Sequence, residues 1–306
     1  MNKDNDHTRM PKTKQLVKPS LGIHYGMSEV AYHKLDACNA STLGNLKDSN
    51  ERMAMFKRST EEEDTIPRRV GRAVHLRIES QEKFNQTYRR PDECAQPGCA
   101  RFGNKYDERG QWWCGYHGKK VPPVLDGATI LPVLEYDMVV AMSRNIEEHP
   151  KVGALIKATP QKMKEVVLVW ESQVYPKLMH KSRIDLLCGE KKMVIDLKTS
   201  RDVSPARFKN DALKFNYWIQ AALYMRGVEA LFPGEFKHYM IVSVEKTPPF
   251  QVAAYVLDPS WIGMIQEQLE KEGGYIDRYS QAVSTNQWPG YDDLMDLEPP
   301  AYFQNI

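Results

Sequence analysis

Residues 183–198 read RIDLLCGEKKMVIDLK and have the pattern of a β-hairpin. Two largely apolar runs flank a tight turn at Glu190-Lys191, which Gly189 precedes. Folding the chain about this turn pairs Cys188 with Met193, Leu187 with Val194, Leu186 with Ile195, Asp185 with Asp196 and Ile184 with Leu197.

Because alternate residues of a strand share a face, this register predicts one apolar face and one polar face. The apolar face consists of Ile184, Leu186, Cys188, Met193, Ile195 and Leu197. The polar face sets Asp185 opposite Asp196, with Lys198 two residues further on. Like charges that face each other across two strands are destabilising. One interpretation is that these are solvent-facing charges on an exposed strand, and the other is a metal site.

A divalent cation would explain the opposed carboxylates. Asp185 and Asp196 offer the oxygen ligands that Mg²⁺ and Mn²⁺ prefer. Such a metal polarises a phosphodiester and lowers the pKa of a bound water. Lys198 would point into the same site and place a cation near the attacking water or the developing phosphorane. If a metal is bound, the hairpin is therefore suited to phosphodiester hydrolysis.

Composition narrows the class of protein. The chain has 306 residues, 42% hydrophobic and 27% charged, which is typical of a folded globular protein. Its net charge of +2 excludes a polycation, so contact with nucleic acid must come from a local basic face. No apolar run is long enough to span a membrane, and the polar start lacks a signal core, so we expect a cytoplasmic protein.

The order of predicted elements indicates an α/β fold, a central mixed β-sheet flanked by helices. Helices are predicted at 41–58, 68–80, 131–148, 205–226 and 260–279, and strands at 166–170, 181–188, 192–198, 238–244 and 251–257. We expect a flexible N-terminal arm at 1–27, a core domain at 28–280, an irregular insertion at 91–125 and an acidic tail at 281–306.

Two of these helices carry polar residues at helical spacing. Tyr217, Gln220 and Tyr224 share one face of the helix after the hairpin and could bind a phosphate or orient a carboxylate. Gly71 and His75 lie one turn apart on the second helix, where His75 could ligate a metal. The alternatives are an ordinary amphipathic helix and a core histidine with satisfied hydrogen bonds.

The insertion has the spacing of a zinc site. Cys94-x4-Cys99-x14-Cys114-x2-His117 supplies four ligands in two pairs, which suits tetrahedral, structural Zn²⁺. Such a metal would order a segment with no apolar period. The alternatives are free cysteines in a loop and an iron–sulfur cluster. Basic residues nearby also make the insertion a candidate DNA contact; they are Arg101, Lys105, Lys119 and Lys120.

In this order, the motifs resemble the RecB-like branch of the PD-(D/E)XK nuclease superfamily. The matching segments are Gly71-Arg-Ala-Val-His75, Asp185, Asp196-Leu-Lys198 and Gln220-Ala-Ala-Leu-Tyr224. A nearer resemblance is to the RecE-type phage exonucleases, exonuclease VIII among them, through residues 32–43 and Ser182-Arg-Ile-Asp185. The resemblance covers about residues 28–280 without the insertion. It implies a PD-(D/E)XK nuclease domain.

The resemblance also implies roles for individual residues. Asp185 and Asp196 would hold the metal, His75 would complete its ligands, and Lys198 would position the attacking water. Gln220 and Tyr224 would contact a DNA phosphate or the residues around the metal ligands. A further acidic ligand is expected before the hairpin, either Glu165 or Glu171.

The function implied is Mg²⁺- or Mn²⁺-dependent exonuclease action on double-stranded DNA ends during phage recombination. The resemblance further implies a single-strand annealing partner and a homo-oligomer. Two alternatives stay open: a non-catalytic DNA-binding or assembly module with the nuclease fold, and an endonuclease or nickase. No phosphate-binding loop of the Gly-x4-Gly-Lys-Ser/Thr type is present, so no ATP motor is expected.

Overall fold

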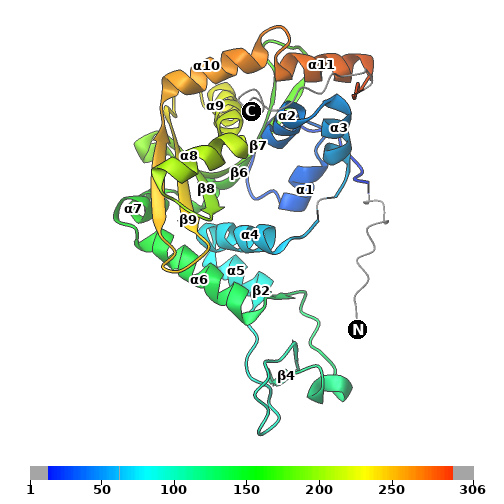
Figure 1. Cartoon of the computed structure of the whole chain (residues 1–306), viewed down its shortest axis with the longest axis vertical. Helices are drawn as coiled ribbons and strands as arrows, with labels where there is room; N and C mark the ends of the chain where they lie inside the picture. The colour runs from blue at the N-terminus through cyan, green and yellow to red at the C-terminus, as the bar shows by residue number, and fades with distance from the viewer. Residues whose placement is uncertain (1–12, 62, 292–306) are drawn as a thin grey trace, which may run out of the picture.

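The computed structural model describes residues 13–61 and 63–291. A six-stranded sheet lies between two layers of helices, and a small lobe projects from one end of the molecule (Figure 1). The strands follow the order β1-β6-β7-β8-β9-β10, with β1 (Gly22–His24), β6 (Lys164–Glu171), β7 (Met179–Cys188), β8 (Met193–Ser200), β9 (His238–Glu245) and β10 (Val252–Leu257). Only β8 and β9 pair in parallel among these neighbours. The predicted mixed sheet with flanking helices is confirmed.

Each face of the sheet has its own apolar core. The first core lies under α2 (Ala40–Asp48), α3 (Glu51–Ser59), α8 (Pro205–Lys214), α9 (Tyr217–Leu231), α10 (Pro259–Glu270) and α11 (Tyr275–Thr285). The second core lies under α4 (Ile66–Glu79), α5 (Gln81–Thr87), α6 (Val133–Glu148) and α7 (Pro150–Ala158). The short α1 (Glu29–Lys34) packs Tyr32 near Val167 and Val169 of β6. The strands that carry the candidate site are therefore held from both sides.

Three helices that the sequence predicts as continuous are interrupted. The helix expected at 41–58 divides into α2 and α3, where Asn50 caps α3 by accepting a hydrogen bond from the Met53 N–H. The helix expected at 205–226 breaks at Asn216, whose backbone is left-handed with φ 59°. The helix expected at 260–279 breaks at Gly273, with φ 73°. The sequence does not predict these breaks, because the apolar periodicity continues across them.

The ends of the described chain are in contact with the domain. Gly22–His24, which the sequence analysis placed in a flexible arm, form the edge strand β1 and pair with β6. At the other end, Trp288 packs on Tyr279 of α11. Residues 1–12 of the expected arm and residues 292–306 of the expected acidic tail lie outside the described residues.

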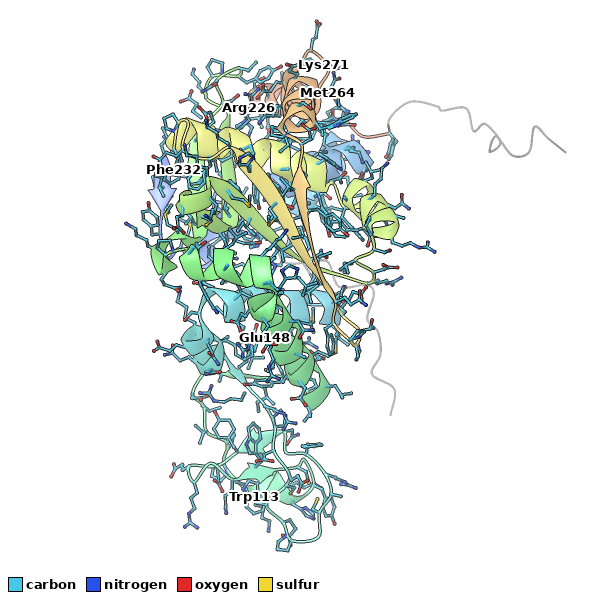
Figure 2. All side chains as sticks on the ribbon, turned by 90° about the vertical axis from the view of Figure 1, so that its left-hand side faces the viewer. Trp113, Glu148, Arg226, Phe232, Met264 and Lys271 are labelled. Atoms are coloured by element: carbon cyan, nitrogen blue, oxygen red, sulfur yellow. The ribbon has the colours of Figure 1, made fainter. Side chains whose placement is uncertain are left out.

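The insertion forms the lobe. It leaves the body after β2 (Tyr88–Arg89) and returns at β5 (Thr129–Ile130), and these two strands pair in parallel. The lobe contains a small hairpin, β3 (Lys105–Tyr106) and β4 (Trp112–Trp113), followed by the 3₁₀ turn His117–Lys120. Figure 2 shows Trp113 at the far end of the molecule from Met264 and Lys271.

Among the described helices, none combines the length and the apolar character that crossing a bilayer requires.

Candidate active site

The strand pairing is interrupted where the polar residues meet. β6 and β7 pair at Lys164 with Leu186 and again at Val166 with Ile184. Glu165, which lies between these pairs, has a left-handed backbone with φ 52°. An irregularity of this kind re-aims the side chains beside it. It makes room for a pocket at the middle of the sheet.

Two details of the predicted hairpin are wrong. Between β7 and β8 the ladder has the predicted register from the turn as far as Leu186 and then ends. The N–H of Leu197 donates instead to Asp185 Oδ2 at 2.6 Å, so Asp185 and Asp196 do not pair directly across the ladder. Ile184 packs in the first core, whereas Leu186 packs in the second, so Ile184 does not belong to the predicted apolar face.

Helix α4 brings His75 to the acidic residues of β6 and β7. His75 Nδ1 lies 3.3 Å from Asp185 Oδ1 and 3.8 Å from Glu165 Oε1. One ligand atom from each of these three side chains lies within 4.8 Å of the others, which is close enough to share a metal ion. Arg183 Nε lies 2.9 Å from Glu165 Oε2 and partly balances its charge.

A second group lies on β8 and α9. Lys198 Nζ lies 2.6 Å from Asp196 Oδ2, and Gln220 Nε2 donates to Asp196 Oδ1 at 2.7 Å. The ammonium of Lys198 also lies 5.0 Å from the ring centroid of Tyr217, a cation–π distance. Tyr224, one turn beyond Gln220, is buried and lines the same cleft. In this conformation Asp196 therefore contacts Lys198 and Gln220 rather than His75.

The buried carboxylates perturb one another. Burial and the charge of Asp185 raise the pKa of Glu165 to about 8. Burial raises the pKa of Asp196 to about 6, although the adjacent Lys198 opposes the shift. Burial disfavours the imidazolium of His75, but the charge of Asp185 and its hydrogen bond outweigh this and raise the pKa to about 9. Glu165 and Asp196 therefore hold protons more tightly than ordinary carboxyl groups, and His75 holds its proton more tightly than an ordinary imidazole.

The donor set fits a divalent cation. Glu165 Oε2 and Asp196 Oδ2 are buried oxygens that accept no hydrogen bond from the described residues, and their close neighbours are the ion-pairing Arg183 and Lys198. Hard carboxylate oxygens with one imidazole are the ligands of Mg²⁺ and Mn²⁺. Bringing such a cation into the site would neutralise charges that folding has placed together.

The site opens into a cleft of about 750 Å³. All six predicted catalytic residues line it, together with Glu165 and Arg183; the six are His75, Asp185, Asp196, Lys198, Gln220 and Tyr224. A second cavity of about 540 Å³ shares Tyr32, Asn39, Ser41, Gln220 and Tyr224 with the cleft and continues past Lys57 and Lys214. A chain of phosphates could therefore pass from one cavity to the other.

The structure distinguishes the two candidates for the further acid. Glu165 lies in the cleft and is buried, whereas Glu171 is exposed and accepts a hydrogen bond from the Lys177 N–H at the other end of β6.

Two further residues line the cleft. The sequence analysis assigned no role to Arg183. Arg183 lies two residues before Asp185 on β7, and its side chain lies near Glu165 in the cleft. Gly71 also lines the cleft, and a Cβ there would lie 3.7 Å from Thr199 Oγ1, an ordinary contact. Gly71 thus widens the cleft but is not needed for the packing of α4 on β8.

The four predicted zinc ligands lie together in the lobe, outside this cleft. One ligand atom from each of them lies within 4.8 Å of the others; they are Cys94, Cys99, Cys114 and His117.

Three comparisons with known proteins bear on this site. Residues 28–298 match the family model described as "PDDEXK-like domain of unknown function (DUF3799)". No curated protein matches the chain. A crystal structure from Eubacterium rectale named "Putative exonuclease" superposes with a TM-score of 0.54 at 12% identity, over 88% of this chain and 92% of that one. A phage-related exonuclease from Haemophilus somnus 129PT gives a TM-score of 0.32 at 14% identity, over 82% and 96%.

The first structural similarity supports the fold alone, because the identity is low, and the second is too weak to carry an argument. The family match covers most of the chain and includes every residue of the cleft that the sequence analysis singled out. The chain therefore belongs to the PDDEXK-like domain family DUF3799, which confirms the predicted resemblance to the PD-(D/E)XK superfamily.

Proposed function

We propose that this protein is a Mg²⁺- or Mn²⁺-dependent exonuclease that hydrolyses phosphodiester bonds at the ends of double-stranded DNA. The observation that carries the proposal is the convergence of two groups in one cleft. His75, Glu165 and Asp185 form a metal-sized cluster, and Asp196 beside them holds Lys198. The name "exonuclease" borne by a protein of similar fold agrees with it.

His75, Glu165 and Asp185 would hold the cation, and Asp196 would join them by exchanging its contact with Lys198 for the metal. When bound, a divalent cation polarises the scissile phosphate and lowers the pKa of the attacking water. The N–H of Leu197 fixes Asp185, and Gln220 fixes Asp196, through hydrogen bonds that occupy one oxygen of each carboxylate. The other oxygen of each carboxylate faces a basic group, His75 for Asp185 and Lys198 for Asp196, and would become a ligand when that contact is exchanged for the metal.

Lys198 would serve as a fixed positive charge. Burial disfavours its ammonium form, but the charges of Asp196 and Asp185 outweigh that and raise its pKa above the usual value. In this arrangement it is therefore a positive charge near neutral pH. Its three N–H donors would orient the attacking water or stabilise the charge that develops on the phosphorane.

The polarity of the cleft favours a charged, extended substrate. Two connected cavities are lined by polar, basic and acidic side chains, and the basic ones, Lys57, Arg68 and Lys214 in the second cavity among them, could contact the phosphates of a DNA strand that passes through the site. We further propose, from the resemblance to RecE-type exonucleases, a role in phage recombination, a single-strand annealing protein as partner and a homo-oligomeric state, beside the cytoplasmic location that the sequence analysis expects on other grounds. None of these features depends on the site itself.

The test is digestion of linear duplex DNA labelled at either end, in Mg²⁺ and in EDTA, with Asp185→Asn and Asp196→Asn beside the wild type. We expect Mg²⁺-dependent loss of the terminal label that is absent from both variants. Closed circular duplex is the control, because an exonuclease leaves it intact whereas an endonuclease or nickase cuts it. DNA binding without digestion under any divalent metal would instead support a non-catalytic assembly module.

A further inference from the structure

The lobe has no apolar core of its own. None of the described residues 91–125 belongs to any of the three clusters of buried apolar side chains. Its buried side chains instead include Cys94 and Cys114, at 7% and 3% exposed. A segment of this size needs some other source of stability, because it cannot bury enough apolar surface to offset the entropy of ordering.

The four candidate ligands come from two separate parts of the lobe. Cys94 and Cys99 lie before the β3–β4 hairpin, and Cys114 and His117 follow it directly. Main-chain hydrogen bonds from Ala95 N–H to Trp112 C=O and from Asn104 N–H to Trp113 C=O hold the first part beside the strand that leads into the second. The cysteine and histidine side chains thus meet at the point where a crosslink would fix the lobe.

The distances match a tetrahedral zinc site. His117 Nδ1 lies 3.6 Å from Cys94 Sγ and 3.6 Å from Cys114 Sγ. Zinc–sulfur and zinc–nitrogen bonds of the usual lengths, set at the tetrahedral angle, separate sulfur from nitrogen by about 3.6 Å. Neutral packing of the same groups would not require both sulfurs to be equally distant from one ring nitrogen.

Main-chain N–H groups point at two of the sulfurs. Cys114 N–H donates to Cys94 Sγ at 3.5 Å, and His117 N–H donates to Cys114 Sγ at 3.5 Å. Such donors stabilise thiolates, which are the form of cysteine that binds metal. All the cysteines are free thiols in the structure, so none of these sulfurs is used in a disulfide.

We propose that Cys94, Cys99, Cys114 and His117 bind one Zn²⁺ ion that folds the lobe and takes no part in catalysis. The four protein ligands complete a tetrahedral shell, so the ion has no open position for water or substrate. Three thiolates and a histidine differ from the oxygen-rich set in the cleft, so the two sites select different metals.

The charge of the lobe favours this structural role over a DNA contact. Between residues 91 and 125 there are five basic and four acidic side chains; they are Arg101, Lys105, Arg109, Lys119 and Lys120, and Asp92, Glu93, Asp107 and Glu108. A zinc ion with three thiolates adds one further negative charge. The lobe as a whole is then close to neutral and offers little attraction for phosphates.

The experiment is measurement of the zinc content of the untagged full chain by mass spectrometry, after desalting, for wild type, Cys99→Ala, His117→Ala and Cys188→Ala. We expect about one zinc per chain in wild type and in Cys188→Ala, a free cysteine in β7, and loss of most of it in the other two variants. Replacement of zinc by Co²⁺ should give the visible absorption of a tetrahedral thiolate site in the wild type.

Asp185→Asn separates this proposal from the proposed nuclease. We expect this variant to keep its zinc while it loses cleavage, because Asp185 lies in the cleft. Zinc that is lost from Asp185→Asn but kept in Cys99→Ala would overturn the proposal, as would a metal-free wild type with a disulfide among the three lobe cysteines. If the lobe variants do not fold, a mercurial titration of wild-type thiols gives the answer: release of one zinc supports the site, and no release refutes it.

Discussion

Glu165 is the residue at which backbone strain and charge coincide. A non-glycine residue with φ 52° is in a sparsely populated conformation that costs about 1–3 kcal/mol. The same residue is 5% exposed and lies beside Asp185 and His75. Strain of this kind persists where the surrounding structure gains from it, and here the gain is a carboxylate aimed into the cleft. We therefore expect Glu165 to be the acidic ligand that precedes the hairpin.

Replacing Glu165 with Gln should raise the Mg²⁺ concentration needed for half-maximal cleavage by about 10-fold or more, because a charged ligand is lost. The measurement is cleavage rate against Mg²⁺ concentration. Glu171→Gln is the matched control, since Glu171 lies on the same strand but outside the cleft, and its Mg²⁺ response should equal that of the wild type. Equal responses for the two variants would remove Glu165 from the metal site.

Replacing Lys198 with Ala should reduce the cleavage rate by about 100-fold or more, because a fixed positive charge beside the phosphate is lost. DNA binding should change little, since one of many phosphate contacts is removed. The measurements are single-turnover cleavage and fluorescence anisotropy with a labelled duplex in Ca²⁺. A variant that still cleaves at the wild-type rate would exclude Lys198 from the chemistry.

The sequence located the cleft residues well because each one follows a local rule. His75 and Gln220 lie one helical turn from Gly71 and Tyr224, and Asp196 lies two residues from Lys198 on one strand. The role of Glu165 could not be predicted in the same way. Its side chain reaches the cleft through a left-handed backbone, and no alternation of apolar and polar residues predicts that conformation.

Among the helices and strands, too, the sequence predicts the features that depend on local pattern and does not predict those that depend on tertiary contacts. The predicted strands and the helix 68–80 rest on periodicities that the sheet and its second core preserve. The helix predicted at 205–226 is instead bent at Asn216, whose side chain accepts a hydrogen bond from Lys47 and donates one to Asp48 of α2. Those partners lie far away in the sequence, so the break is a tertiary effect that periodicity cannot predict. Beyond the bend, Gln220 of α9 donates a hydrogen bond to Asp196.

Two helix glycines should respond in opposite ways to alanine. A Cβ on Gly227 of α9 would lie 2.5 Å from the Trp170 ring, so Gly227→Ala should lower the free energy of unfolding by about 1–3 kcal/mol through overpacking. Gly263 of α10 has nothing within 4 Å of its Cβ position, so Gly263→Ala should raise it by about 0.5–1 kcal/mol. Urea denaturation measures both. Stabilisation by Gly227→Ala would show that α9 is not in close contact with β6.

At the scale of the whole molecule, the cleft lies where the two helical layers and the interrupted ladder meet. The second layer supplies His75 from α4, the sheet supplies the carboxylates and Lys198, and the first layer supplies Gln220 and Tyr224 from α9. Folding must therefore bury several charges together. The stability of the protein should depend on how those charges are neutralised.

Without a divalent metal, the contribution of the cleft to stability should fall as pH rises. The pKa of Glu165 is raised from 4.5 to about 8, and that of Asp196 is raised from 3.8 to about 6. For each group, at a pH between its unfolded and its folded pKa, the unfolded chain binds fewer protons than the folded chain. The pKa of His75 is raised from 6.5 to about 9, so its stabilisation is complete below 6.5 and is lost as pH rises through 9. All three cleft shifts therefore act in the same direction between about pH 4 and pH 9. Burial lowers the pKa of His180 to about 4 and that of Lys181 to about 7, and these two groups outside the cleft act in the opposite direction.

A divalent cation should reverse this trend, because it binds deprotonated carboxylates and competes with the proton on His75. The rise in Tm caused by Mg²⁺ or Mn²⁺ should therefore be larger at about pH 8.5 than at about pH 6. The difference should be roughly 2 °C or more for each kcal/mol by which metal binding stabilises the folded protein more at the higher pH. Differential scanning calorimetry in EDTA and in metal at both pH values measures it. Glu165→Gln is the control: the amide does not titrate, so the pH dependence of the metal effect should shrink. An equal rise in wild-type Tm at both pH values would mean that the cation binds away from these carboxylates.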